Sequence, residues 1–364
     1  MIRAVLVDDE PPARVRMRQL LDAAGDVAVV GEAGNADEAR AVIRETLPDL
    51  LFLDVEMPEV RGTALAASLP EPRPFIVFAT AFDNYALDAI AVDATDYLLK
   101  PVSRSKLAAT LDRVRARLAQ LTVEHDIVAA TKVQSRMWPG SLPRIAGFDC
   151  AAASLPARGV GGDFYDLFPI AGASGATGAW AFLLGDASGK GVAAGLVASA
   201  VQARVNTAAR LAHLQPEELI AAVDRDVYAT TDGARYATAI YGVLDASSRH
   251  LTLVNAGHPE VLMIPGGQVG ATGPALGLIE AGTFGTHAVT LAPGTLVLAH
   301  TDGVTEARNE AEEEFGQARL LELADSCRDR SATEVCSAVL NAVREFRGLR
   351  QDQDDVTLLV IKGL

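Results

Sequence analysis

The chain has 364 residues, which exceeds the usual size of one domain and favours two domains with a connector. Its 49% hydrophobic and 22% charged residues are typical of an ordered globular protein and argue against a disordered one. The net charge of −15, without a run of Lys or Arg, argues against nucleic acid as the main partner.

The sequence also favours a cytoplasmic location. Asp8, Asp9 and Glu10 interrupt the first apolar stretch, so the N-terminus lacks the pattern of a signal peptide. No apolar run reaches the length of a membrane span, so we expect no membrane partner. The three cysteines lack metal-site spacing and are typical of reduced thiols.

Residues 1–118 alternate short apolar runs with helix-like segments. This alternation predicts an α/β domain with a doubly wound, five-stranded parallel sheet and helices on both faces. Ligands of such sheets bind at the carboxyl ends of the strands. The runs expected to form strands are Ile2 to Val7, Val27 to Val30, Leu50 to Leu53, Pro74 to Ala79 and Tyr97 to Leu99.

Five polar residues lie at the ends of these strands. They are Asp8 and Asp9 at the first, Asp54 at the third, Thr80 at the fourth and Lys100 at the fifth. Three carboxylates at one sheet edge repel one another unless a hard cation such as Mg²⁺, which prefers oxygen ligands, neutralises them. Asp54 can then act as nucleophile toward a phosphohistidine donor, while Thr80 and Lys100 bind the phosphoryl oxygens.

The same part of the chain resembles the receiver domains of two-component response regulators, which have the CheY-like fold. The resemblance implies that a sensor histidine kinase phosphorylates Asp54, and that Asp8, Asp9 and Asp54 bind Mg²⁺. It further implies that Thr80 moves inward on phosphorylation and that Tyr97 reorients. The matching segments are VDDE (7–10), LFLDVEMP (51–58), FAT (78–80) and DYLLKPV (96–102).

A narrow apolar stripe follows Pro101 and predicts a long helix. Its members are Leu107, Leu111, Val114, Leu118 and Leu121, and Val128 continues the register. The stripe can be the last receiver helix packing on its own sheet, or its extension past Leu118 can form a coiled coil. We favour a helical linker over residues 119–140, broken at Trp138-Pro139-Gly140, and therefore expect a homodimer.

Residues 141–364 contain blocks of strand-like runs and blocks of amphipathic helix, which predicts a layered α+β domain. The clearest strand-like runs are Trp180 to Leu184, Ala237 to Leu244, Leu251 to Val254, Thr295 to Ala299 and Val356 to Ile361. The clearest helical segments are Val192 to Leu211 and Ala332 to Phe346.

Four acidic motifs in this region point to hard metal ions. They are GGDFYD (161–166), GDASGKG (185–191), TDGVTEA (301–307) and QDDVT (353–357). Two ions about 3.5–4 Å apart need carboxylates around them, and the glycines let a main-chain carbonyl approach as a further ligand. These motifs lack His, Cys and nucleophilic Ser arrangements, which disfavours zinc and a covalent intermediate. GDASGKG also fails the spacing of a nucleotide-binding P-loop.

In their order these motifs resemble the metal-dependent type 2C (PPM) serine/threonine phosphatases, in the SpoIIE/RsbU-like branch. NAGHP (255–259) and GPALGL (273–278) extend the match. The resemblance implies an α-β-β-α sandwich, two Mn²⁺ or Mg²⁺ ions, and in-line attack of a metal-activated water on phosphoserine or phosphothreonine. The implied metal ligands and catalytic residues are Asp163, Asp186, the carbonyl of Ala187, Asp302 and Asp354.

Within that set Asp186 would bridge both ions, and Asp302 and Asp354 would hold the second. Asp354 is preferred over Asp355 because the family's ligand lies three residues before the Thr of the last strand. Asp163 would bind directly or through water.

Three further residues keep two interpretations each. Arg158 can clamp the substrate phosphate or be an ordinary surface arginine. Ser188 stands where eukaryotic relatives have a His proposed to protonate the leaving group, a step that metal-bound water can then take. His258 lies in a family motif and is interpreted as structural more readily than catalytic.

We therefore expect a response regulator in which phosphorylation of Asp54 controls a protein phosphatase. The resemblance implies that the substrate is a phosphorylated anti-sigma-factor antagonist of the STAS type. The alternative is a catalytically weak or inactive adaptor that binds a partner protein. The sequence does not specify the kinase, the direction of control, or Mn²⁺ against Mg²⁺.

Overall fold

A five-stranded parallel sheet forms the centre of the first unit, Met1–Glu124. The computed structural model describes residues 1–81, 92–155, 159–170, 178–212, 214–350 and 354–364. The strand order is β2-β1-β3-β4-β5, as expected of a CheY-like receiver. The strands are β1 (Ile2–Val7), β2 (Val27–Ala33), β3 (Leu50–Leu53), β4 (Phe75–Thr80) and β5 (Asp96–Leu99).

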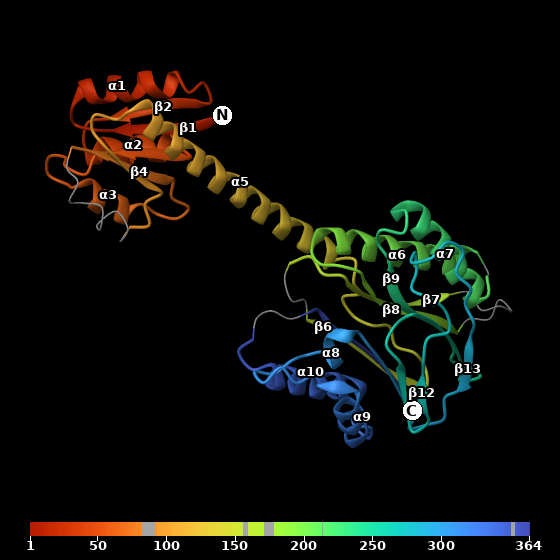
Figure 1. Ribbon diagram of the computed structural model, residues 1–364. Helices are drawn as coiled ribbons and strands as arrows, with labels where there is room; N and C mark the ends of the chain where they lie inside the picture. The colour runs from red at the N-terminus through yellow and green to blue at the C-terminus, as the bar shows by residue number, and fades with distance from the viewer. Residues whose placement is uncertain (82–91, 156–158, 171–177, 213, 351–353) are drawn as a thin grey trace. The chain divides into compact units, whose positions relative to one another are not determined.

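Helices cover both faces of this sheet (Figure 1). Successive strand residues point to opposite faces, so Leu6 packs in one core and its neighbour Val7 in the other. The first core also holds residues of α1 (Pro11–Asp22) and α5 (Arg104–Gln134), and the second those of α2 (Ala36–Thr46) and α3 (Gly62–Ser68). The predicted doubly wound α/β architecture is confirmed.

The long helix α5 has two different halves. Leu107, Leu111 and Val114 are buried against the receiver sheet, as a last receiver helix requires. Leu121 and Val128 continue the same stripe, but their side chains are 53% and 52% exposed. The stripe therefore packs on its own sheet at first and leaves its later members uncovered.

The second unit, His125–Leu364, contains two five-stranded antiparallel sheets. One has the order β13-β10-β9-β8-β7 and the other β12-β11-β14-β15-β6. The strands are β6 (Phe148–Leu155), β7 (Asp163–Ile170), β8 (Ala179–Ala187), β9 (Ala237–Asp245), β10 (His250–Ala256), β11 (Val261–Ile264), β12 (Gly267–Val269), β13 (His287–Thr290), β14 (Leu296–His300) and β15 (Val356–Gly363).

The two sheets pack face to face, with helices on their outer faces. On the first sheet lie α6 (Val192–Leu211) and α7 (Pro216–Thr231). On the second lie α8 (Asp302–Thr305), α9 (Gly316–Ser326) and α10 (Ala332–Arg347). This is the predicted α-β-β-α sandwich.

The sequence of β15 explains this layering. Leu358 and Val360 enter the core under α9 and α10, whereas Leu359 and Ile361 enter the core between the sheets. A strand buried on both faces is therefore apolar at consecutive positions, as the VTLLVI run is.

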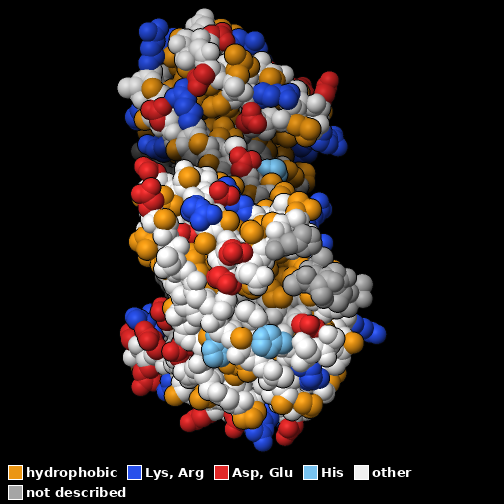
Figure 2. Space-filling view, turned by 90° about the vertical axis from the view of Figure 1, so that its right-hand side faces the viewer, with side chains coloured by type: hydrophobic (Ala, Val, Ile, Leu, Met, Phe, Trp, Pro, Cys, Tyr) orange, Lys and Arg blue, Asp and Glu red, His pale blue; other side chains and the backbone are white. Residues whose placement is uncertain are grey.

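Figure 2 shows one face of the molecule, on which acidic and basic side chains alternate with scattered hydrophobic ones. Across the described residues, none of the helices is both long enough and apolar enough to cross a membrane.

Candidate functional site

The carboxyl ends of β1 and β3 hold the predicted receiver carboxylates. Oxygen atoms of Asp8, Asp9 and Asp54 all lie within 4.8 Å of one another, so the three can share a cation. Lys100, at the end of β5, places its Nζ 2.6 Å from both Asp8 and Asp54. The donor set therefore fits a hard cation, and Lys100 already balances part of its charge.

Burial and pairing act against each other at this site. Burial raises the pKa of Asp8, although the hydrogen bond from Lys100 opposes that rise. Burial opposes the charged form of Lys100, but its bonds to Asp54 and Asp8 outweigh this and raise its pKa. Lys100 therefore stays cationic beside the two acids.

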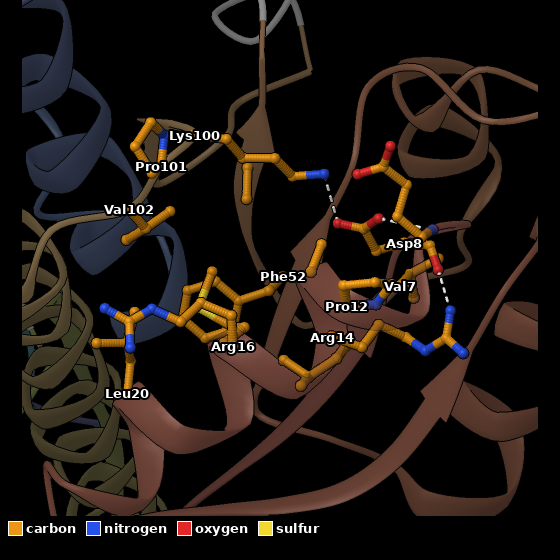
Figure 3. Close-up of a pocket in the computed structure, with 15 residues that line it drawn as sticks. Val7, Asp8, Pro12, Arg14, Arg16, Leu20, Phe52, Lys100, Pro101 and Val102 are labelled. Carbon is orange, nitrogen blue, oxygen red and sulfur yellow. Dashed lines mark hydrogen bonds and ion pairs between the residues drawn. The ribbon is translucent and has the colours of Figure 1, made fainter.

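Beside this acidic cluster is a cavity of about 260 Å³ between α1 and the end of β5. Figure 3 shows Lys100 reaching toward Asp8 at one end, while Phe52, Leu20 and Val102 line the apolar remainder. Arg14 and Arg16 of α1 also line the cavity, so basic side chains border it away from the strand termini as well.

The two predicted switch residues lie on neighbouring strands. Thr80 is fully buried at the end of β4, and its hydroxyl has no hydrogen-bond partner among the described residues. Tyr97 lies on β5, directly beside Phe78 of β4, and is partly buried. An unpaired buried hydroxyl is costly, so Thr80 is suited to binding a phosphoryl oxygen.

In the second unit, the two sheets bring the acidic motifs together. Asp163 at the start of β7 is directly opposite Asp186 of β8 in the first sheet. Asp302 begins α8, which follows β14, and Asp354 precedes β15. Strands β14 and β15 both belong to the second sheet. The motifs are up to 191 positions apart, yet their charges act on one another.

The mutual repulsion of these carboxylates contributes to their raised pKa values. Burial, with the charges of Asp302 and Asp354, raises the pKa of Asp186 to about 7. Burial and the nearby Asp186 hold the pKa of Asp163 well above its usual range. Burial and Asp354 also raise the pKa of Asp302. Oxygen donors that repel one another this strongly fit a bound divalent cation.

The glycines of the motifs allow a close approach of the chain segments. A Cβ on Gly162 would lie 2.7 Å from Asp186 Oδ1 and 2.8 Å from the carbonyl oxygen of Ala187. Both contacts are too short for any side chain, so only glycine fits here. Gly162 also accepts a 3.1 Å hydrogen bond from the Ala187 amide, which fixes the Ala187 peptide beside Asp186.

Adjacent acids in the last motif have different environments. Asp355 is 9% exposed and accepts a 2.9 Å hydrogen bond from the Gly162 amide. The Asp354 side chain is 53% exposed and pairs with Lys190 at 3.1 Å. Asp355 thus holds the loop before Asp163, while Asp354 remains accessible.

Thr301 and Thr357 support Asp163. The Thr301 hydroxyl donates to Asp163 Oδ2 at 2.8 Å and accepts from the Thr357 amide at 2.9 Å. Sequence reasoning missed both roles, although the Thr before Asp302 and the Thr ending QDDVT belong to the motifs it identified.

His258 joins the two sheets behind the site. Its Nδ1 lies 2.8 Å from the Thr238 hydroxyl of β9 and its Nε2 lies 3.0 Å from the His300 carbonyl of β14. Burial lowers the pKa of His258 to about 3, so the ring is neutral. Thr238 is opposite Asp186 in the sheet, so His258 ties the strand of Asp186 to the strand before Asp302.

Ser188 and Arg158 complete the sequence-predicted set. The Ser188 hydroxyl accepts a 3.1 Å hydrogen bond from the Tyr236 amide, and the Ser188 carbonyl accepts one from Arg235 at 3.1 Å. Ser188 thus fastens the loop after Asp186 to the start of β9. Arg158 lies outside the described residues.

The end of α5 also contacts the GGDFYD motif, which sequence reasoning missed. The buried Gln134 side chain donates to the Gly161 carbonyl at 2.7 Å and accepts from the Gly161 amide at 3.0 Å. Gly161 is two residues before Asp163. A buried side chain with both amide atoms paired to one backbone residue holds that backbone tightly.

Comparison with known proteins matches each of the two units to a different family model. The family model of stage II sporulation protein E (SpoIIE) matches residues 176–363, more than half of the chain, and that of the response regulator receiver domain matches residues 4–112. The transcriptional regulatory protein BtsR of Salmonella typhi is 48% identical over 116 residues, 32% of this chain and 48% of that protein. BtsR of Escherichia coli is 47% identical over 116 residues, with the same coverage. The chain spans about half the length of the curated relatives it matches.

Two solved structures resemble the second unit. The RsbU and RsbW domains of Rv1364c from Mycobacterium tuberculosis have 28% identity and a TM-score of 0.53, covering 62% of this chain and 63% of that one. The SiaA-PP2C domain of Pseudomonas aeruginosa, at 20% identity and a TM-score of 0.57, covers 67% and 98% and shares the fold. The chain therefore belongs to the SpoIIE family, with a PP2C-type phosphatase domain joined to a response-regulator receiver domain.

Proposed function

We propose that this protein is a metal-dependent phosphoserine/phosphothreonine protein phosphatase whose activity is controlled by phosphorylation of Asp54. The observation that carries the proposal is the convergence of Asp163, Asp186 and Asp302, whose pKa values are all raised by burial and mutual repulsion. Lys190 lies near Asp302 and Asp354, but a group of carboxylates that repel one another this strongly is unfavourable unless metal ions offset the remaining charge.

In this proposal two Mn²⁺ or Mg²⁺ ions would be held by Asp186 together with the Ala187 carbonyl, Asp302, Asp354 and Asp163. The bound ions would supply an activated water and offset the charge that develops on the phosphoryl oxygens. Thr301 holds Asp163 in one orientation through its 2.8 Å hydrogen bond. Asp355 accepts the hydrogen bond of the Gly162 amide and so holds the loop before Asp163 close to Asp186.

The receiver supplies the control. A sensor histidine kinase would transfer the phosphoryl group of its phosphohistidine to Asp54, leaving the kinase histidine free, and Asp8, Asp9 and Asp54 would hold the Mg²⁺ ion that offsets its charge. Lys100, now within 2.6 Å of Asp54, would bind a phosphoryl oxygen as the carboxylate is modified. The unpaired hydroxyl of Thr80 would bind another, and Tyr97 would follow it inward.

Residues 119–140 transmit the change in this proposal. Gln134, at the end of α5, is bonded to Gly161 at both its amide atoms, so movement of the helix would displace the loop before Asp163. The exposed Leu121 and Val128 continue a heptad-like stripe, and covering them by the same helix of a second copy would bury both. We therefore propose a homodimer joined through this segment.

The proposed substrate is a phosphorylated anti-sigma-factor antagonist of the STAS type. Family membership supports it, as does the M. tuberculosis structure, which contains an RsbU domain together with an RsbW domain. The alternative is an adaptor that binds a partner without turnover. The complete set of acidic residues favours the enzyme.

The test is hydrolysis of p-nitrophenyl phosphate and of a phosphoserine peptide with Mn²⁺, with and without the phosphoryl mimic BeF₃⁻. We expect activity that requires Asp186 and that changes with BeF₃⁻ in the wild type but not in Asp54→Ala. Activity that survives Asp186→Ala would contradict the proposed site. An inactive wild type that binds its partner would support the adaptor.

A further inference from the structure

A second, positively charged pocket adjoins the proposed catalytic carboxylates. Its volume is about 190 Å³, and its wall includes Gly303, which follows Asp302, together with Asp354. Four basic residues also line it, which stands out in a chain with a net charge of −15. These residues are Lys190, Arg308, Arg347 and Arg350.

Three of the four cations are in exposed, exchangeable pairs. Lys190 is 73% exposed and lies 3.1 Å from Asp354, a carboxylate that the proposed function assigns to a metal ion. Arg308 pairs with Glu314 at 2.8 Å, and Arg350 with Glu312 at 2.6 Å, with all four side chains partly or largely exposed. Exposed pairs contribute little to stability, so an incoming anion can compete for these side chains.

Arg347 differs from the other three. One of its terminal nitrogens donates to the Gly303 carbonyl at 2.8 Å, which anchors the guanidinium to the loop after Asp302. The same terminal nitrogen also lies 3.4 Å from the Asp354 carbonyl, and in the part of the chain that the structure describes Arg347 forms no ion pair with a carboxylate. A half-buried cation paired mainly to carbonyl groups is one that a nearby anion would stabilise.

We infer that this pocket is a subsite for a carboxylate side chain of the phosphoprotein substrate, close in sequence to the phosphorylated residue. The inference rests on the proposed function and adds a substrate preference to it. The phosphoryl group itself goes to the acidic centre, while Asp354 and Gly303 belong to both the centre and the pocket wall. An anion in the pocket therefore has to come from a residue near the phosphoserine.

The chemistry fits a carboxylate. Planar guanidinium groups present paired N–H donors that match the two oxygens of Asp or Glu. Glu306 and Asp354 also line the pocket, but the four basic residues outnumber these two acids. The pocket can thus accept a negative charge beside an acidic catalytic centre.

Two phosphoserine peptides of equal length test this, one with glutamates on both sides of the phosphoserine and one with glutamines in their place. At low salt we expect kcat/KM to favour the glutamate peptide about tenfold, the size of one charge-assisted hydrogen bond, and the preference to fall as salt rises. The double variant Arg308→Gln/Arg350→Gln should bring the ratio close to one. Arg328→Gln, which changes an exposed arginine paired with Asp325, should keep it.

Equal kcat/KM for both peptides in an active wild type, or an unchanged ratio in the double variant, overturns the subsite. Fluorescence anisotropy of the same two peptides, each with a fluorescent label, compares their binding affinities without turnover. A chain that binds the glutamate peptide preferentially but hydrolyses neither peptide keeps the subsite and overturns the proposed phosphatase. A third peptide with a second phosphoserine in place of the glutamates shows whether the pocket takes phosphate instead, and a preference for it over glutamate overturns the carboxylate assignment.

Discussion

The two acidic sites of this protein differ in how the negative charge of their carboxylates is balanced. In the receiver, Lys100 lies within 2.6 Å of Asp8 and Asp54, so a fixed cation balances the carboxylates. In the phosphatase domain, Asp163 and Asp186 have no Lys or Arg partner in the described part of the chain, and their pKa values rise. The receiver site therefore has part of its counter-charge in the chain itself, whereas the proposed phosphatase site would take its counter-charge from bound cations.

The largest expected effect is on catalysis. Asp186→Ala removes the carboxylate shared by both proposed ions and should lower Mn²⁺-dependent hydrolysis of p-nitrophenyl phosphate at least about thousandfold. Asp226→Asn changes an exposed aspartate on α7 and should have wild-type kinetics. Retention of more than a tenth of the activity in Asp186→Ala would show that the two-ion assignment is wrong.

The second-largest expected effect is on how the stability of the metal-free protein depends on pH. Asp186 has a pKa of about 7 when folded against 3.8 for an ordinary Asp, so folding favours its protonated form. This preference contributes fully to the free energy of unfolding below the pKa that Asp186 has in the unfolded chain. The contribution is lost as the pH rises from about 4 through about 7. Metal-free protein should melt several degrees higher at pH 5.5 than at pH 7.5, and saturating Mn²⁺ should remove most of this difference.

Both tryptophans, Trp138 and Trp180, belong to the second unit, so tryptophan fluorescence follows the phosphatase domain in this experiment. Asp186→Asn should weaken the pH dependence, since it removes one of the titrating groups. A melting temperature that rises with pH over this range would contradict the repulsion argued here.

A smaller effect is expected in the receiver. Lys100→Met leaves Asp8 and Asp54 without their shared cation and should destabilise metal-free protein by about 2 kcal/mol, allowing for partial exposure. Mg²⁺ should restore much of the loss. Urea denaturation followed by a receiver-specific probe, with and without Mg²⁺, measures both effects, and no loss in the absence of Mg²⁺ would count against Lys100 as the balancing charge.

The smallest effect concerns the connection of α5 to the catalytic loop. Gln134→Ala removes two hydrogen bonds to Gly161 and should cost about 1–2 kcal/mol. It should also reduce the change in activity caused by BeF₃⁻. Gln120→Ala, an exposed glutamine on the same helix, is the matched control. An unaltered BeF₃⁻ response in Gln134→Ala would place the transmission elsewhere.

Strand positions were predictable wherever the apolar run coincided with the strand. Strand β8 continues past the predicted Trp180 to Leu184 run to Ala187, and the edge strand β2 continues past the predicted Val27 to Val30 run to Ala33. Its extension contains Gly31 and Glu32, and Glu32 binds Arg18 at 2.6 Å on the exposed edge. Edge strands tolerate polar residues, so hydrophobicity alone ends them too early. Helix α7 is not among the helices predicted above, although Pro216 at its start and its capping box are usual start signals.

The amino-acid sequence by itself determined the two-domain architecture, the receiver carboxylates and the acidic motifs, because each depends on residues that are local in the chain. Only the tertiary structure decided that Asp355 supports the loop while Asp354 stays accessible, and that Gln134 holds Gly161. These contacts join residues 193 and 27 positions apart. Their partners are set by how the two sheets and the end of α5 pack, which no local pattern specifies.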